Sequence, residues 1–365
     1  MRKKWLTGSL AVLLAFVLVL TGCGAKETPK NALEGAFIKS TEMKSYAFKS
    51  SITVNDLQMD GADLGDPSVA MVINMLKNAE LTIDGVAQLD PMQVEATLNV
   101  ALKGDMAFSF SLPMVITPDK MYYKIPNIPM LGLPADIVDK YLVLDMKELA
   151  EQAGEPIPTV DVVKTQKFSN EFLKEVMGKF DEKTYFSEIA VKDANLPEGV
   201  EAKQVVKVAI TKDNFDQAVT TIVKDALPAL IDLMSKDEYK ELFQIDQADL
   251  DQLKSEMTAT DSELKEGLEE IKKSLTVNEL SMTTAINKDG YPVYQTIIGN
   301  VDFKDETDQM KLVVHVNTTT SNINEKAEFK IGIPTDTITM EQLQESYFGA
   351  MYDLSEYDEE LDAIE

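Results

Sequence analysis

The chain contains one cysteine, Cys23, and one histidine, His315. A single cysteine excludes disulfides and thiolate clusters within the chain, and a single histidine excludes a histidine pair that ligates zinc. A Ser-His-Asp triad would have to use His315, which alternates with Leu312 and Val314 along a strand-like stretch and is predicted to face the surface. No G-x-S-x-G, P-loop or G-x-G-x-x-G motif occurs. The sequence therefore predicts a protein that is not an enzyme and that binds no cofactor.

Cys23 stands at the end of a leader. Residues 1–4 carry three positive charges and residues 5–20 are almost wholly apolar, as in a secretory signal. The letters LTGC at 20–23 resemble the bacterial lipobox, in which the cysteine sulfur is diacylated and the signal is cut just before it. A buried free cysteine is the alternative, but a cysteine that closes an apolar leader has no core to join. We expect a signal peptide at 1–22, a diacylglyceryl group on Cys23 and a tether at 23–30.

This leader also predicts location and partners. The protein should be lipid-anchored at the extracytoplasmic face of the cell membrane, with its N-terminal diacylglyceryl cysteine in the bilayer. The formal net charge is −27, and it becomes −30 once residues 1–22, with their three positive charges, are removed. Such a charge disfavours nucleic acid as a partner, and broad contact with anionic lipid as well. The simplest interpretation is a solvated, acidic surface around a core.

Carboxylates are numerous enough that calcium has to be considered. The stretches DGADLGD (60–66) and DQADLD (246–251) are both acidic. Neither has the alternate ligands, central glycine and terminal glutamate of an EF-hand loop. A polar loop explains the first stretch and an exposed helix start explains the second, so no metal site is predicted.

The folded part begins with a helix that Asn31 is expected to open. From Tyr46 onward the hydrophobic period is two, as where Met92, Val94 and Ala96 alternate with Gln93. Such one-sided strands are typical of an antiparallel sheet with one apolar face and one polar face. The letters NKDG at 287–290 predict a hairpin turn between two of them. About twelve strands are expected in all.

Helical periodicity returns in two places. Residues 168–180 form one amphipathic stretch, and residues 213–275 form a longer one in which Asp213 and Thr260 are predicted helix starts and Pro228 a kink. We expect one domain at 31–338 with a helical insertion at about 213–275. A short helix and an acidic tail are predicted at 339–365.

Two apolar segments fall outside this pattern. They are VAMVINML (69–76) and IPNIPMLGL (125–133), and the prolines of the second forbid regular structure. Such a segment either seals a core, lines a site for an apolar ligand, or touches the bilayer surface. In the second interpretation the ligand would lie near the residues Met121, Tyr123, Ile128, Met130 and Leu131.

The order of these elements resembles the LolA/LolB and LppX/LprG-like half-barrel lipoproteins. More narrowly, ALEGAFIKSTEMKSYAFKSSITV (32–54) and MYYKIPNIPML…KYLVLDMKEL resemble a family of Gram-positive surface lipoproteins. The resemblance implies an α+β fold in which a curved antiparallel sheet, a half-barrel of about 10–12 strands, wraps helices and leaves a cavity for acyl chains. The long helical stretch at 213–275 departs from that pattern, and it would plug or enlarge the cavity.

Two functions follow as hypotheses. In the first, the protein is a membrane-anchored, non-enzymatic lipoprotein that binds a hydrophobic or lipid-like ligand in the half-barrel. In the second, it is a structural or interaction lipoprotein of the cell envelope, with a packed core and an acidic surface that contacts wall polymers or proteins.

Overall fold

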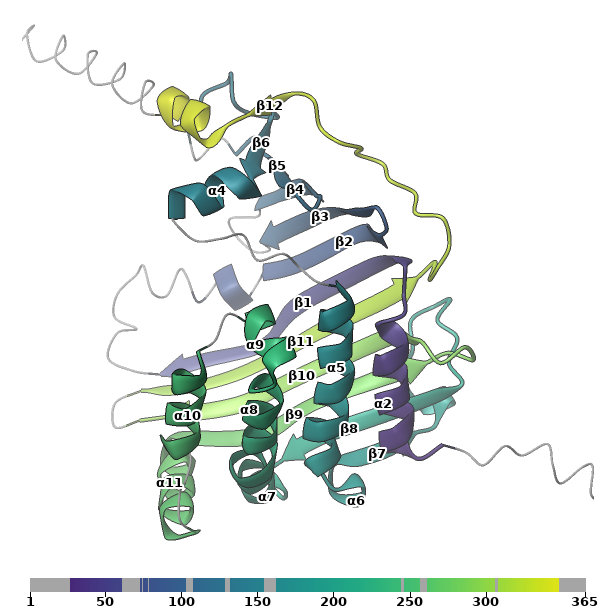
Figure 1. Cartoon of the computed structure of the whole chain (residues 1–365), viewed down its shortest axis with the longest axis vertical. Coiled ribbons are helices and arrows are strands. Elements are labelled where there is room, and N and C mark those ends of the chain that lie inside the picture. The colour runs from purple at the N-terminus through teal and green to yellow at the C-terminus, as the bar shows by residue number, and fades with distance from the viewer. Residues whose placement is uncertain are drawn as a thin grey trace, which may run out of the picture.

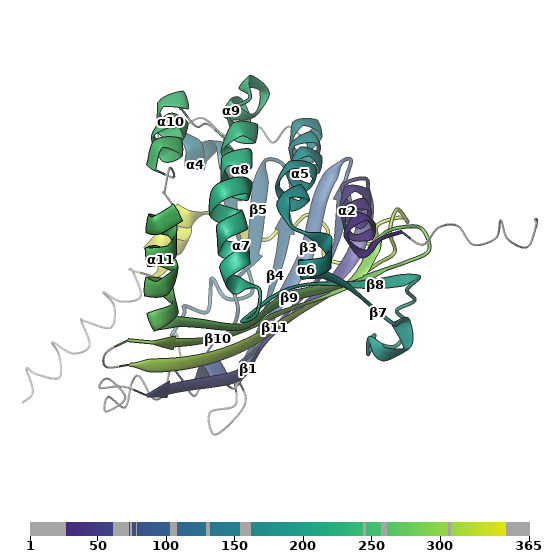
Figure 2. The same ribbon diagram turned by 90° about the horizontal axis from the view of Figure 1, so that it is seen from below.

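The computed structural model describes residues 27–60, 73, 75–77, 79–102, 108–128, 132–153, 162–243, 246–256, 261–305 and 308–347. Within these residues, twelve strands form one sheet, which is not closed, and helices lie on one side of it (Figure 1). The fold is therefore α+β. The sheet curves, and the helices stand on the inner side of the curve (Figure 2).

The strands are β1 (Ser45–Asp60), β2 (Ala79–Leu89), β3 (Met92–Leu102), β4 (Phe108–Ile116), β5 (Lys120–Lys124), β6 (Tyr141–Asp145), β7 (Phe186–Ile189), β8 (Gln204–Thr211), β9 (Leu275–Ile286), β10 (Pro292–Lys304), β11 (Gln309–Ser321) and β12 (Thr337–Ile338). Their order in the sheet is β12-β6-β5-β4-β3-β2-β1-β11-β10-β9-β8-β7. Two runs of sequential neighbours, β1–β6 and β7–β11, are thus joined by the pairing of β1 with β11.

The sheet is mixed, which corrects the expectation of a purely antiparallel one. The strand β12 pairs with β6 in parallel, whereas the other pairs that the structure describes are antiparallel. The predicted hairpin joins β9 to β10, and Gly290 at φ 87° supplies the left-handed conformation that the turn needs.

Most of the helices fall into three groups along the chain, and a further helical segment follows β12 at 340–347, within the range predicted for a short helix. The helix α2 (Pro29–Ser40) precedes β1, and the group between β6 and β7 comprises α4 (Met146–Ala153), α5 (Val162–Val176) and α6 (Glu182–Tyr185). Between β8 and β9 lie α7 (Phe215–Thr221), α8 (Leu227–Met234), α9 (Asp237–Phe243), α10 (Gln247–Glu256) and α11 (Asp261–Ser274). No helix in the described ranges is long and apolar enough to cross a membrane.

Two helix starts differ from the sequence prediction. The cap of α2 is Thr28, whose hydroxyl accepts the backbone N–H of Asn31 at 3.4 Å, so Asn31 is inside the helix. The cap of α7 is Asn214, next to the predicted Asp213. The chain then passes through one π-helical turn, Ile222–Ala226, directly before the proline at the start of α8. Proline cannot donate the backbone hydrogen bond of a continuous α-helix, which explains the irregular turn.

The main core lies where α2 and α7 pack on the strands β7–β9. Leu33 and Ala36 of α2, Phe186 of β7 and Val206 of β8 are buried together, and Ala218 of α7 joins them. The small residues of α2 allow it to lie close to the sheet. This contact identifies the face of each strand that points toward the helices.

The strands β2 and β3 approach each other closely at Gly85. A Cβ atom at this position would overlap the backbone oxygen of Glu95 and the ring of Phe48. Only glycine fits there, so Gly85 allows the ring of Phe48 to lie over the β2 backbone.

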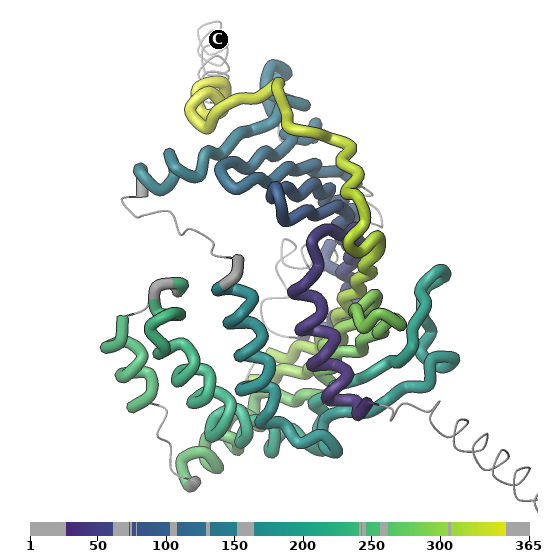
Figure 3. Tube along the Cα trace, turned by 45° about the vertical axis from the view of Figure 1, so that its right-hand side comes forward, coloured from purple at the N-terminus to yellow at the C-terminus, as the bar shows by residue number. Residues whose placement is uncertain are grey.

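A long connection returns from β11 to the far end of the sheet. We call residues 322–336 the strap, since this segment runs from the end of β11 along the outside of the sheet to β12 (Figure 3). At its far end, Ile338 is buried with Ile125 and Ile137, and Leu142 of β6 packs against them. The strap therefore carries β12 to the strand that it pairs with.

Candidate functional site: the helix-side face of the sheet

The two faces of the sheet differ sharply in chemistry. We call the face that carries Phe186, Val206 and Met282, which pack with α2 and α7, the helix-side face, and the opposite one the outer face. The strand registers extend this assignment from β7 to β6, because residues that pair across strands point to the same side.

One set of paired positions on the helix-side face is apolar across nine strands. We call it the apolar row. From β4 to β7 through the sheet it consists of Phe110, Val100, Leu81, Ile52, Val316, Ile297, Met282, Val208 and Phe186. Strands lie about 4.8 Å apart, so the part from β4 to β10 spans about 24 Å.

The apolar row is covered at one end and accessible in the middle. Phe186 is buried in the core under α2. In contrast, Ile52 on β1 is 41% exposed and Ile297 on β10 is 47% exposed. Leu280 of β9, which pairs with Gly299 on the same face, is 40% exposed. Several large apolar side chains on neighbouring strands are thus open to solvent on one face.

Charged side chains are absent from this face over most of the sheet. On the described strands β1–β6 and β8–β11, the helix-side positions hold no Asp, Glu, Lys, Arg or His. The outer face carries the ion pairs instead. Lys207 and Glu279 lie 2.6 Å apart there, and Lys311 and Asp56 lie 2.8 Å apart. The hydrogen bond from Lys207 lowers the pKa of the Glu279 carboxyl below its ordinary value.

A small polar cluster interrupts the apolar surface next to the apolar row. We call Ser50, Thr318, Gln295 and Thr284 the hydroxyl–amide cluster; they pair in register on the helix-side face, two residues along each strand from the apolar row. The hydroxyls of Ser50 and Thr318 are 2.8 Å apart, and the Gln295 amide nitrogen donates to Thr284 Oγ1 at 3.4 Å. Thr284 is fully buried and the other three are half-buried.

The predicted ligand-contacting residues are only partly brought together. Met121 and Tyr123 lie half-buried on the helix-side face of β5, and the Tyr123 hydroxyl donates to the sulfur of Met121 at 3.3 Å. Ile128 is buried, as is Ile125 at the start of the same loop. Met130 and Leu131 lie outside the described residues, and so does Cys23.

The other segments singled out in the sequence, His315 and the acidic and apolar stretches, form no metal site in the described part of the chain. His315 pairs with Thr53 and Ile298 on the outer face. The stretch at 246–251 is the start of α10, and its residues are exposed except for the buried Leu250. Residues 61–66 lie outside the described ranges, as does most of 69–76. In the part that is described, no group of three or more His, Cys, Asp or Glu side chains is placed to hold a metal ion.

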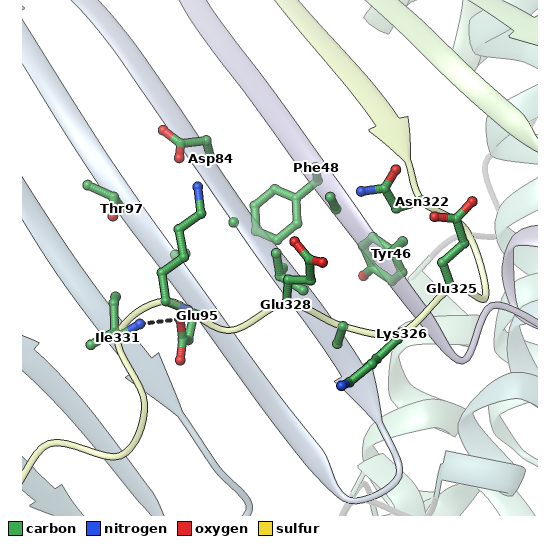
Figure 4. A pocket seen from close by; sticks show the side chains of 16 residues that line it. Tyr46, Phe48, Asp84, Glu95, Thr97, Asn322, Glu325, Lys326, Glu328 and Ile331 are labelled. Atoms are coloured by element: carbon green, nitrogen blue, oxygen red, sulfur yellow. Dashed lines mark hydrogen bonds between the residues drawn. The ribbon is translucent and has the colours of Figure 1, made fainter.

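A second feature, on the outer face, was not foreseen from the sequence. Glu95 is only 4% exposed, and its carboxylate accepts the backbone N–H groups of Lys330, Ile331 and Gly332 in the strap at 2.7, 2.8 and 2.7 Å. Beside this contact, a pocket of about 320 Å³ lies between the strap and β1–β3 (Figure 4). The alternation of β3 indicates only that Glu95 leaves the apolar face; the covering strap comes from 235 residues further along the chain.

Comparisons with known protein families, curated proteins and solved structures find no match. The resemblance to half-barrel lipoproteins therefore stays a prediction.

Proposed function

We propose that the protein is a non-enzymatic lipoprotein that holds a hydrophobic or lipid-like ligand against the helix-side face of its sheet. In this proposal the open, curved sheet acts as a half-barrel. Cys23 carries a diacylglyceryl group and anchors the protein at the extracytoplasmic face of the cell membrane. The ligand, not a cofactor, would cover the exposed middle of the apolar row.

The apolar row supports this proposal more than any other feature. A sheet of this size would normally bury such a row completely, because each large aliphatic side chain that leaves water contributes about 1.5–3 kcal/mol. Ile52, Ile297 and Leu280 stay 40–47% exposed, and the helix-side positions of the described strands β1–β6 and β8–β11 carry no charge. A hydrophobic ligand laid along the row would bury them.

The proposal can be tested on the full-length lipoprotein after extraction in mild detergent. Native mass spectrometry should detect bound lipid on the extracted protein. Replacing Ile297 by glutamine introduces a polar amide in the middle of the row and should lower the lipid-bound fraction severalfold. The control is Val191→Gln, which changes an apolar residue of similar exposure (39%) beyond β7, away from the row. Absence of bound lipid from the wild-type protein, or equal loss in both variants, would contradict the proposal.

One observation favours the rival function, an interaction protein of the cell envelope. Ile125 and Ile128 are buried, and Ile125 packs with Ile137 and Ile338. This part of the proline-rich loop thus seals a core and does not offer its isoleucines to a ligand. The rival predicts that the wild-type protein is extracted without lipid and that it is recovered with wall polymers or other proteins.

A further inference from the structure

We propose that the ligand is an uncharged amphiphile, with an acyl chain along the apolar row and a hydroxyl- or ester-bearing head group at the hydroxyl–amide cluster. This inference rests on the proposed function, which leaves the class of lipid open. The same helix-side face of the sheet would select the lipid by its head group.

The absence of charged side chains around the apolar row, on the described strands β1–β6 and β8–β11, argues against a charged head group bound to the sheet. A carboxylate, phosphate or ammonium that enters an apolar groove loses its hydration and needs an opposite charge as compensation. The helix-side positions of the described strands β1–β6 and β8–β11 supply none. The charged residues of these strands, such as Lys207 and Lys311, point to the outer face and are paired there with carboxylates.

The hydroxyl–amide cluster offers what an uncharged head group needs. Ser50 and Thr318 share one hydrogen bond, so one of the two hydroxyl protons remains available to donate. The amide nitrogen of Gln295 contacts Thr284 and the sulfur of Met282, whereas no described residue donates a hydrogen bond to its carbonyl oxygen. The cluster can therefore donate to an ester carbonyl and accept from a hydroxyl of the same ligand.

The position of the hydroxyl–amide cluster fits a ligand that has both a polar head group and an acyl chain. Ser50 precedes Ile52 by two residues on β1, and Gln295 precedes Ile297 by two residues on β10. Two residues of a strand span about 7 Å. A head group bound at the cluster would therefore place the start of its chain on the exposed middle of the apolar row.

The test uses membranes that carry the full-length protein and three photoactivatable probes with the same chain. The probes are a monoacylglycerol, the corresponding fatty acid and a plain alkane, each with a diazirine in the chain, and the labelled peptides are mapped by mass spectrometry. We expect labelling of β1, β10 and β11, with the monoacylglycerol labelling at least fivefold more than the fatty acid. One neutral hydrogen bond corresponds to a change of about this size.

Variants separate this inference from the proposed function. Gln295→Leu and Thr318→Val should each lower monoacylglycerol labelling about fivefold and leave alkane labelling unchanged, which also reports that the sheet has folded. The control is Thr296→Val, on the outer face of the same strand. Equal labelling by the three probes, or a preference for the fatty acid, overturns the inference but not the proposed function. If no probe labels the helix-side face, the proposed function fails as well.

Discussion

The ionisable side chains of the sheet are held on its outer face, and Lys207 and Glu279 illustrate how. They lie on the adjacent strands β8 and β9, where Lys207 also donates a hydrogen bond to Glu279 and the Ser281 hydroxyl donates a second one. Both bonds favour the ionised carboxylate, and together they outweigh its partial burial, so its pKa lies below the ordinary value. The pair is about 30% exposed, so its contribution to stability is at most about 1 kcal/mol.

The lowered pKa of Glu279 predicts that the stability of the folded protein depends on pH. Because the folded state holds the Glu279 proton less tightly than the unfolded chain, the contribution is complete at neutral pH and is lost as the pH falls below about 4. We expect Glu279→Gln to be less stable than the wild type at pH 7, and the difference in stability to shrink as the pH falls below about 4. Urea unfolding followed by tyrosine fluorescence measures this, since Trp5, the sole tryptophan, lies in the predicted signal peptide. A difference that stays constant with pH would contradict the prediction.

At the scale of elements, one carboxylate holds the middle of the strap. Its two ends are bonded elsewhere: the backbone N–H of Asn324 donates to the Ser45 carbonyl, and the backbone N–H of Tyr141 donates to the Asp336 carbonyl. Glu95 projects from β3 and binds three successive backbone N–H groups of the strap, and Gln93 donates a further hydrogen bond to it at 3.3 Å. A buried carboxylate is stable only with such partners. The strap in turn covers the carboxylate, so each depends on the other.

We therefore expect Glu95→Ala to release the middle of the strap, around residues 330–332. Hydrogen bonds to a charged group contribute about 1.5–3 kcal/mol each but are not additive, so the free energy of unfolding should fall by about 2–4 kcal/mol. Trypsin should cleave the variant faster at Lys326 and Lys330. The matched control is Asp84→Ala, which removes an exposed carboxylate from the same pocket. Equal cleavage in both variants would show that Glu95 does not hold the strap.

The same elements show what the sequence can predict. Period-two alternation correctly indicated which residues of β3 and β11 share a face, because one side of each strand must leave water. The Asn-Lys-Asp-Gly turn was also readable, since its geometry depends on neighbouring residues. The sequence could not show that β1 pairs with β11, that β12 pairs in parallel with β6, or that the strap covers Glu95. Each of these contacts joins segments more than 190 residues apart. The hydroxyl–amide cluster was missed for the same reason: its members look like scattered polar residues until four strands align.

At the scale of the whole molecule, we propose that an acidic folded domain is attached to the membrane by one lipid anchor. Residues 23–28 precede Pro29, where α2 begins, so the predicted tether is shorter than 23–30 and would keep the folded part near the bilayer. We expect Cys23→Ala to abolish labelling by a palmitate analogue and to leave residues 1–22 attached, which the intact mass reports. His315→Ala, on the outer face, serves as a control that should be labelled and processed normally. An unlabelled wild-type chain, or a Cys23→Ala chain that is cut normally, would contradict lipidation.

The central pairing of the sheet has a consequence for how the protein is made. The strand β1 is among the first to be synthesised, yet its partner β11 follows about 250 residues later, and β6 waits for β12. Ribosomes add about 5–20 residues per second, so both strand edges stay unpaired for many seconds while the chain emerges. Unpaired edges attract other chains, and pairings of such long range form slowly. We therefore expect the chain to fold slowly and to be prone to aggregation until its last strands are in place.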